Sequence, residues 1–289
     1  MLTIRRKQRS AFGGAPAKVA AVVPASTADA GHGPIGVRIR PEQMKTFEQT
    51  ARIPFEDEMV THSKEFTPRL CEVLGEKQLR VALRYAMDRA NGYEFTFRGP
   101  LRLFIEMMFL FGSAFDTDPQ YPWASQILRS PDDQMRRAEQ LFNKILDYQE
   151  KVSGPAGSNT LRALRELLAL SQEPLAFGVD DFVAGMRKEM ARVFPEKVAY
   201  IGNEGLVALI RGGRADADKH RFSSPRGETV FTTLMFALGH GCTDDPLYPW
   251  IEKTLTDERI TDPTARAERL EKKAVTWLEH VLAKPPGGV

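Results

Sequence analysis

The chain has few cysteines and no long apolar run. Only Cys71 and Cys242 are cysteines among 289 residues, too few for a disulfide framework or a four-cysteine zinc site. The most apolar stretch, residues 103–111, includes Glu106, whereas a membrane-spanning helix needs about 20 apolar residues. We therefore expect a cytoplasmic protein that does not enter a membrane.

The sequence also lacks the short motifs of common catalytic sites. Its histidines do not form an HExxH pattern, and the glycine-rich segment 211–214 is not followed by the Lys-Ser/Thr of a phosphate-binding loop. Two pairs of acidic residues, Asp116 with Asp118 and Asp244 with Asp245, are too few for an oxygen-ligated metal site. We expect no cofactor and no metal.

Charge is concentrated at the start of the chain, although the whole protein carries only +2. Residues 1–40 hold seven basic side chains and one acidic side chain. The same stretch is rich in Ala, Gly and Pro and has no apolar periodicity, which predicts a flexible basic arm over residues 1–38. A mitochondrial presequence or a contact with nucleic acid is a further interpretation of this arm.

An internal repeat organises the rest of the chain. Residues 55–128 match residues 182–255 without a gap at a shift of 127, with 18 identities in 74 positions. The identities cluster in one string, Met-Phe, Gly, Asp-Pro and Tyr-Pro-Trp, that occurs over 108–123 and again over 235–250. Two copies of this length indicate tandem domains and not a solenoid.

Apolar residues recur at helical spacing in both copies, and no segment alternates as a strand does. Examples are residues 76–91, the nearly all-apolar segment 100–111 and a long amphipathic segment 131–152. The fold class is therefore predicted to be all-α, with two tandem copies of one helical unit after the arm. The predicted boundaries are the arm 1–38, unit 1 over 39–152, a linker 153–159, unit 2 over 160–284 and a tail 285–289.

The repeated string Asp-Pro-x-Tyr-Pro-Trp is the first candidate for a binding site. As structure, the Asp and Pro start a helix and the two rings anchor a loop on the core. As function, a rigid aromatic loop presented twice would form a recognition surface, since Trp and Tyr dominate binding hot spots. We expect the tryptophans in the core and the tyrosines nearer the surface. The candidate binding residues are Asp118, Tyr121, Trp123, Asp245, Tyr248 and Trp250.

Two further pairs of residues need an interpretation. Arg84 and Arg211 occupy one position of both units, which favours a structural arginine paired with an acidic group over an anion-binding site. His240 and Cys242 resemble a base and a nucleophile, but the other unit has Ser113 and Phe115 at these positions. A cysteine that replaces phenylalanine is most simply a core hydrophobe, so we expect no catalytic residues.

The motif residues of unit 1 carry a resemblance to a family. The resemblance is to uncharacterised helical proteins of Gram-negative bacteria, and it rests on residues 55–59, 74–76, Arg84, 108–112, 115–119 and the pair Pro122-Trp123. Proteins of this family are often encoded beside the spike and toxin genes of type VI secretion. The resemblance implies an adaptor that loads a toxin or an immunity protein that blocks one, and it implies no catalytic residues.

The function predicted from the sequence is therefore non-enzymatic binding of a protein partner, a secreted toxin or a spike component. Two alternatives from other classes stay open. One is an enzyme with a site in the groove between the units near His240. The other is a nucleic-acid binder that uses the basic arm, which the net charge of −4 on residues 41–289 disfavours.

Overall fold

The structure is a computed structural model that describes residues 41–174, 177–178, 180–222 and 224–283, with side chains from residue 52 onward. Over these residues the chain is all-α and contains no β-strand, so the predicted fold class is confirmed. No helix in the described part is long and apolar enough to cross a membrane. The predicted arm and tail lie outside the described residues.

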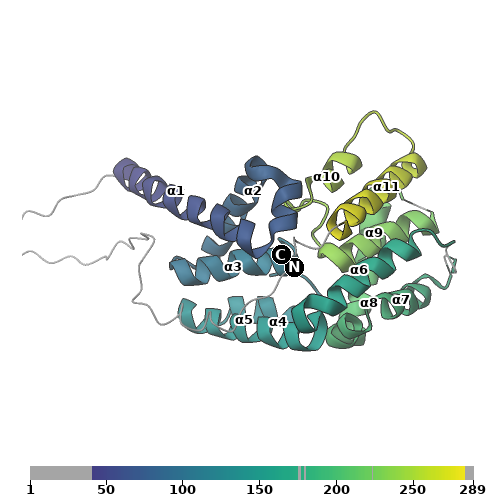
Figure 1. The fold of residues 1–289 in the computed structure, drawn as a ribbon, viewed down its shortest axis with the longest axis horizontal. Helices are drawn as coiled ribbons and strands as arrows, with labels where there is room; N and C mark the ends of the chain where they lie inside the picture. The colour runs from purple at the N-terminus through teal and green to yellow at the C-terminus, as the bar shows by residue number, and fades with distance from the viewer. Residues whose placement is uncertain (1–40, 175–176, 179, 223, 284–289) are drawn as a thin grey trace, which may run out of the picture.

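Eleven α-helices fall into two groups, one on each side of the molecule (Figure 1). The first group consists of α1 (Pro41–Phe66), α2 (Pro68–Asn91), α3 (Arg98–Phe111), α4 (Pro122–Leu128) and α5 (Gln134–Tyr148). The second group consists of α6 (Ser158–Leu170), α7 (Phe182–Val193), α8 (Pro195–Lys219), α9 (Pro225–Leu238), α10 (Pro249–Leu255) and α11 (Pro263–Leu282). The first turns of α1 project from the body of the molecule (Figure 1).

The helices of the two groups recur at the spacing of the sequence repeat. α3 and α9 end 127 residues apart, and so do α4 and α10. Both α2 and α8 are interrupted by a glycine with positive φ, 71° at Gly75 and 75° at Gly202. Residues 98–123 and 226–250 therefore have the same order of elements, a central helix, a loop and the start of a short helix. Superposition of the two units, and so their duplication, stays a prediction.

One apolar core runs through both groups of helices, with α3 and α9 at its centre. α3 contacts α1, α2 and α5, and α9 contacts α7, α8 and α11. Burial on several sides explains why residues 100–111 of α3 are apolar nearly all round. Glu106 is a buried charged residue of α3, and its Oε1 lies 2.8 Å from His62 Nε2 and 3.0 Å from Arg102 Nε.

The segment 153–159 connects the two groups through a folded turn. α5 ends at Tyr148, earlier than the predicted helix 131–152, because a π-helical turn follows over 149–153. A 3₁₀ turn at 155–157 then leads directly into α6. The side chain of Val152 is buried, and its carbonyl accepts a hydrogen bond from Asn159 Nδ2 at 3.1 Å. The connection is thus packed against the core.

Candidate functional site

The two groups of helices meet where α3 and α9 end. An ideal Cβ on Gly112 would lie 2.4 Å from the carbonyl oxygen of Leu238, and one on Gly239 would lie 2.7 Å from that of Phe111. Both glycines have positive φ, 93° and 105°. Only glycine allows this approach of two backbones at these angles. We call residues 111–113 and 238–240 the glycine crossing.

Asp118 and Asp245 bind the glycine crossing from opposite sides. Asp118 Oδ2 accepts a hydrogen bond from the backbone N–H of His240, and Asp245 Oδ2 accepts one from that of Ser113, both at 2.8 Å. Their Oδ1 atoms accept from the backbone of their own loops, at Gln120 and Leu247. Each aspartate of the repeated motif therefore holds the backbone of the other half. Charge-assisted bonds of this kind are stronger than bonds between neutral groups.

The environment of the two aspartates is nearly free of water. Asp118 is 2% exposed and Asp245 is 3% exposed. Burial raises the pKa of Asp245 to about 6, although the N–H groups of Ser113 and Leu247 oppose this rise. The two motif carboxylates are thus enclosed at the junction and do not face solvent. They accept hydrogen bonds from the backbone N–H groups of His240 and Ser113.

The prediction for the aromatic residues of the motif was wrong, because the tyrosines are more buried than the tryptophans. Tyr121 and Tyr248 are buried, whereas Trp123 and Trp250 are half-buried. Each tyrosine directly precedes α4 or α10, and its backbone N–H is bonded to the carbonyl of the motif aspartate. This turn directs the tyrosine ring inward beneath the crossing and leaves the tryptophan on the first turn of the short helix.

Tyr121 belongs to an aromatic cluster that spans both halves. Its ring centroid lies 4.7 Å from that of Phe111 and 5.9 Å from that of Tyr148. Tyr148 in turn meets Tyr200 of α8 at 5.2 Å. In the second half, Tyr248 meets Trp277 at 5.6 Å. The aromatic loops therefore contribute large apolar area to the junction.

Lys197 is a residue of the junction that the sequence interpretation missed. Its side chain is buried, donates a hydrogen bond to the carbonyl of Phe236, and places Nζ 4.7 Å from that ring and 5.8 Å from the Tyr121 ring. Burial lowers the pKa of its ammonium group to about 8, while the charge of Asp118 opposes that change. The repeat alignment could have revealed it, because Lys197 stands where the first unit has the apolar residue Leu70.

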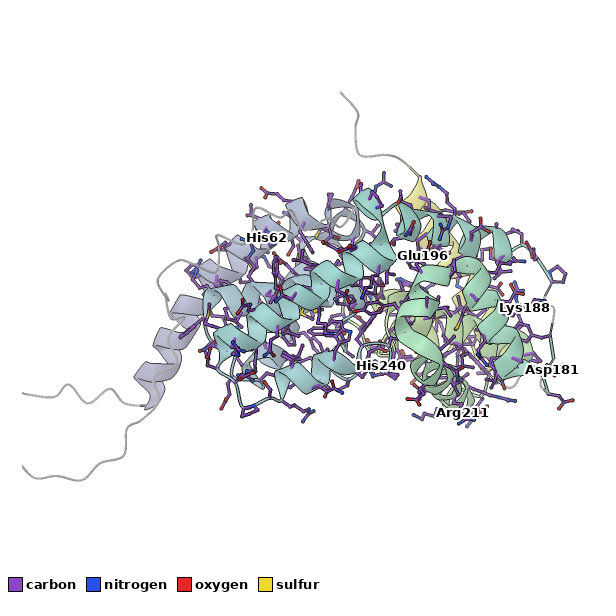
Figure 2. The ribbon with its side chains drawn as sticks, turned by 90° about the horizontal axis from the view of Figure 1, so that it is seen from below. His62, Asp181, Lys188, Glu196, Arg211 and His240 are labelled. Carbon is purple, nitrogen blue, oxygen red and sulfur yellow. The ribbon has the colours of Figure 1, made fainter. Side chains whose placement is uncertain are left out.

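The two repeated arginines have different environments. Arg84 forms two hydrogen bonds with Glu56, at 2.8 and 3.0 Å, as expected for a structural arginine. Burial alone would raise the pKa of Glu56, but the guanidinium groups of Arg84 and Arg80 lower it. Arg211 is exposed at the edge of the second half and has no acidic partner among the described residues (Figure 2). At the position that corresponds to Glu56, the second unit has Val183. Arg211 therefore lacks the carboxylate that pairs with Arg84 in the first unit.

His240 and Cys242 do not form a base and nucleophile pair. Cys242 is 1% exposed, and burial raises the pKa of its thiol well above the ordinary value, so the reactive thiolate is disfavoured. His240 lies between the two groups of helices (Figure 2). Its Nδ1 is 3.4 Å from Asp118 Oδ2, and its Nε2 is 3.4 Å from the Thr117 hydroxyl. The shortest of its contacts with Asp118 is the hydrogen bond that the His240 backbone N–H donates to Asp118 Oδ2 at 2.8 Å.

The acidic residues beside the motif are not arranged as metal ligands in the described part of the chain, where no three His, Cys, Asp or Glu side chains converge. Asp116 is buried and accepts hydrogen bonds from Arg89 at 2.8 Å and from the Tyr93 hydroxyl at 2.6 Å. These two donors orient both of its oxygens. Asp116 therefore fastens the end of α2 to the loop after α3.

The predicted site residues thus fall into three sets. The structure brings Asp118, Tyr121, Asp245 and Tyr248 together at the junction of the halves. It leaves Trp123 and Trp250 half-buried on the first turns of α4 and α10, and it leaves Arg84 and Arg211 apart from the junction. A binding role for any of them stays a prediction. Comparison with known proteins adds no relative, since no family model, no curated protein and no solved structure matches this chain.

Proposed function

We propose that the chain is a non-enzymatic protein-binding protein of the bacterial cytoplasm, an adaptor or an immunity protein for a type VI secretion toxin. One observation carries the protein-binding part. The large apolar side chains that are exposed in the described part of the chain are Ile53, Val73 and Val81, at 61%, 47% and 45%, and all belong to α1 and α2. The secretion context rests on the resemblance of unit 1 alone.

The α1–α2 pair is well suited to present these side chains. Ion pairs join the two helices along their length, from Arg52 with Asp88 at 2.6 Å to Arg84 with Glu56 and Lys64 with Glu76 at 2.8 Å. Exposed apolar side chains on a preformed surface bind a partner with little ordering cost. We name the three exposed apolar side chains of this pair, Ile53, Val73 and Val81, the α1–α2 surface.

The position of Val73 strengthens the argument for this surface. In the repeat alignment its counterpart is Tyr200, whose ring packs against Tyr148 across the junction. Val73 is 47% exposed instead. The first half therefore offers an uncovered apolar side chain at a position where the second half is closed.

The burial of the motif tyrosines moves the proposed partner contact away from the aromatic loops. Tyr121 and Tyr248 are buried against other rings, Phe111 and Trp277, so a partner would have to open this packing to reach them. The α1–α2 surface needs no such change. We therefore assign partner binding to this surface and a structural role to the loops.

Co-purification of the native protein, followed by mass spectrometry of what accompanies it, tests the proposal. We expect a toxin or a spike component. Val73→Glu and Val81→Glu should remove this partner without changing the melting temperature, whereas Lys188→Glu and Arg211→Glu, exposed on the second half, should retain it. Retention of the partner by the Val73→Glu, Val81→Glu double variant would contradict the assigned surface.

Co-expression with the toxin separates the two roles. An immunity protein restores growth of cells that produce the toxin. An adaptor is required for toxin export and leaves the toxicity unchanged. A protein that does neither, although it is present at normal levels, would exclude both roles.

A further inference from the structure

The second half contains an apolar cavity that the proposed function does not use. The cavity has a volume of about 150 Å³ and lies between α6, α7, α9 and α11. Its walls are aliphatic, sulfur-containing and aromatic side chains, among them Leu170, Met186, Met190, Leu234 and Trp277. No wall residue belongs to the glycine crossing except Leu238, which lines one end.

The first half has larger residues at several positions of this wall. In the repeat alignment, Val230, Ala237 and Leu238 of α9 correspond to Leu103, Leu110 and Phe111 of α3. Each replacement removes side-chain volume from the second half. The cavity is therefore lined by three residues of α9 that are smaller than their counterparts in α3.

Every charged side chain of the wall has a partner of opposite charge. Arg226 forms an ion pair with Glu271 and donates to the carbonyl oxygens of Ser171 and Glu173 at 2.9 and 3.0 Å. Arg192 pairs with Glu173 at 3.0 Å and with Glu189 at 3.3 Å. A charged ligand would have to displace one of these partners and also lose its water.

We propose that this cavity binds an uncharged apolar small molecule, or an uncharged apolar group, of about the size of a benzene ring. The size follows from the volume, because an apolar protein cavity of about 150 Å³ is large enough to bind benzene. The chemical class follows from the apolar wall and the paired charges. The inference does not rest on the proposed protein partner.

Fluorobenzene is a suitable probe, observed by fluorine NMR with the full chain. We expect saturable line broadening with the natural protein. Ala237→Leu restores the leucine of the first half, and Ala274→Leu fills the cavity from α11, so each should weaken binding at least tenfold. Ala215→Leu adds the same volume at an exposed position of α8 outside the cavity wall and should bind as the natural protein does.

The charge of the probe tests the chemical class. 4-Fluorobenzoate and 4-fluorobenzylammonium should bind at least tenfold more weakly than fluorobenzene. Glu271→Gln frees the Arg226 guanidinium, so this variant should gain affinity for 4-fluorobenzoate and keep its affinity for fluorobenzene.

Three results would overturn the proposal: no saturable binding of fluorobenzene to the natural protein, undiminished binding to both filled variants, or equal binding of the charged probes. Circular dichroism shows whether each variant is folded. If Ala237→Leu does not fold, the binding of fluorobenzene to Ala274→Leu decides whether filling the cavity weakens binding. Loss of the protein partner in the co-purification experiment would leave these outcomes unchanged, so the two proposals fail separately.

Discussion

Lys197 is held in the junction by groups that replace water around its ammonium. Its hydrogen bond goes to the carbonyl of Phe236, which lies in the last turn of α9 where carbonyl groups lack helical partners. Two ring faces and the charge of Asp118 complete its surroundings. Since the ammonium remains poorly hydrated, its pKa falls to about 8 from an ordinary value of 10.5.

This shift predicts a dependence of stability on pH. Between pH 8 and 10.5 the unfolded chain keeps the Lys197 proton and the folded chain releases it, so the free energy of unfolding should rise with pH, by at most about 3 kcal/mol. Urea denaturation of the natural protein and of Lys197→Met at pH 7, 8 and 9 isolates this contribution, because the buried thiols of Cys71 and Cys242, whose pKa values are raised, oppose the rise equally in both proteins. The free energy of unfolding of the natural protein should rise with pH relative to that of Lys197→Met, and parallel pH dependences of the two proteins would contradict the prediction.

The motif aspartates give a second prediction at the scale of single residues. Asp118→Ala and Asp245→Ala each leave a buried backbone N–H of the other half without its acceptor, and each should cost about 2–4 kcal/mol of unfolding free energy. Asp88→Ala, which removes only an exposed ion pair with Arg52, should cost less than about 1 kcal/mol. Urea unfolding compares the three variants, and equal losses would contradict the reciprocal hydrogen bonds.

At the scale of elements, the ends of α3 and α9 depend on two glycines. Gly112→Ala places a Cβ against the carbonyl of Leu238 in a backbone conformation with φ of 93°, and something must move to admit it. We expect a loss of about 3 kcal/mol or more, as for other overpacked sites with backbone strain. Thermal unfolding measures this loss.

Two other glycines provide controls for this prediction. Gly75 has φ of 71° and ψ of 156°, a conformation that is essentially restricted to glycine, but open space surrounds its Cβ position, so Gly75→Ala should cost about 1–3 kcal/mol from backbone strain alone. Gly212 lies within α8 in open space, so Gly212→Ala should stabilise the protein by about 0.5–1 kcal/mol. If all three substitutions changed the stability by the same amount, the close approach of the two backbones at the glycine crossing would not be the cause of the loss in Gly112→Ala.

At the scale of the whole molecule, the shared core and the crossing predict one cooperative unfolding transition. Neither group of helices has a closed surface at the junction, because the Tyr121 cluster and Lys197 pack across it. Calorimetry should give a single peak with equal calorimetric and van't Hoff enthalpies. The double variant Asp118→Ala, Asp245→Ala should broaden or divide this peak. Two peaks in the natural protein would mean that the halves unfold independently.

The helices could be predicted from the sequence because their signals are local. The apolar face of residues 76–91 and the nearly all-apolar segment 100–111 each act within a few residues. The prediction that the motif Asp and Pro start a helix was wrong, because α4 and α10 begin at Pro122 and Pro249, and the aspartates bind the crossing instead. The predicted helix 131–152 begins later, at Gln134, and its last turn is π-helical over 149–153.

The sequence by itself thus determined an all-α chain and the recurrence of its motif. It did not determine what the motif contacts, because similarity between two copies cannot reveal that Asp118 bonds to His240 and Asp245 to Ser113. Only the tertiary structure decided that the tyrosines are buried, that Lys197 lies among rings, and that smaller residues on α9 line a cavity. The physical reason is that helix formation depends on neighbours in sequence, whereas burial and pairing across the junction depend on residues that are from 52 to 132 positions away.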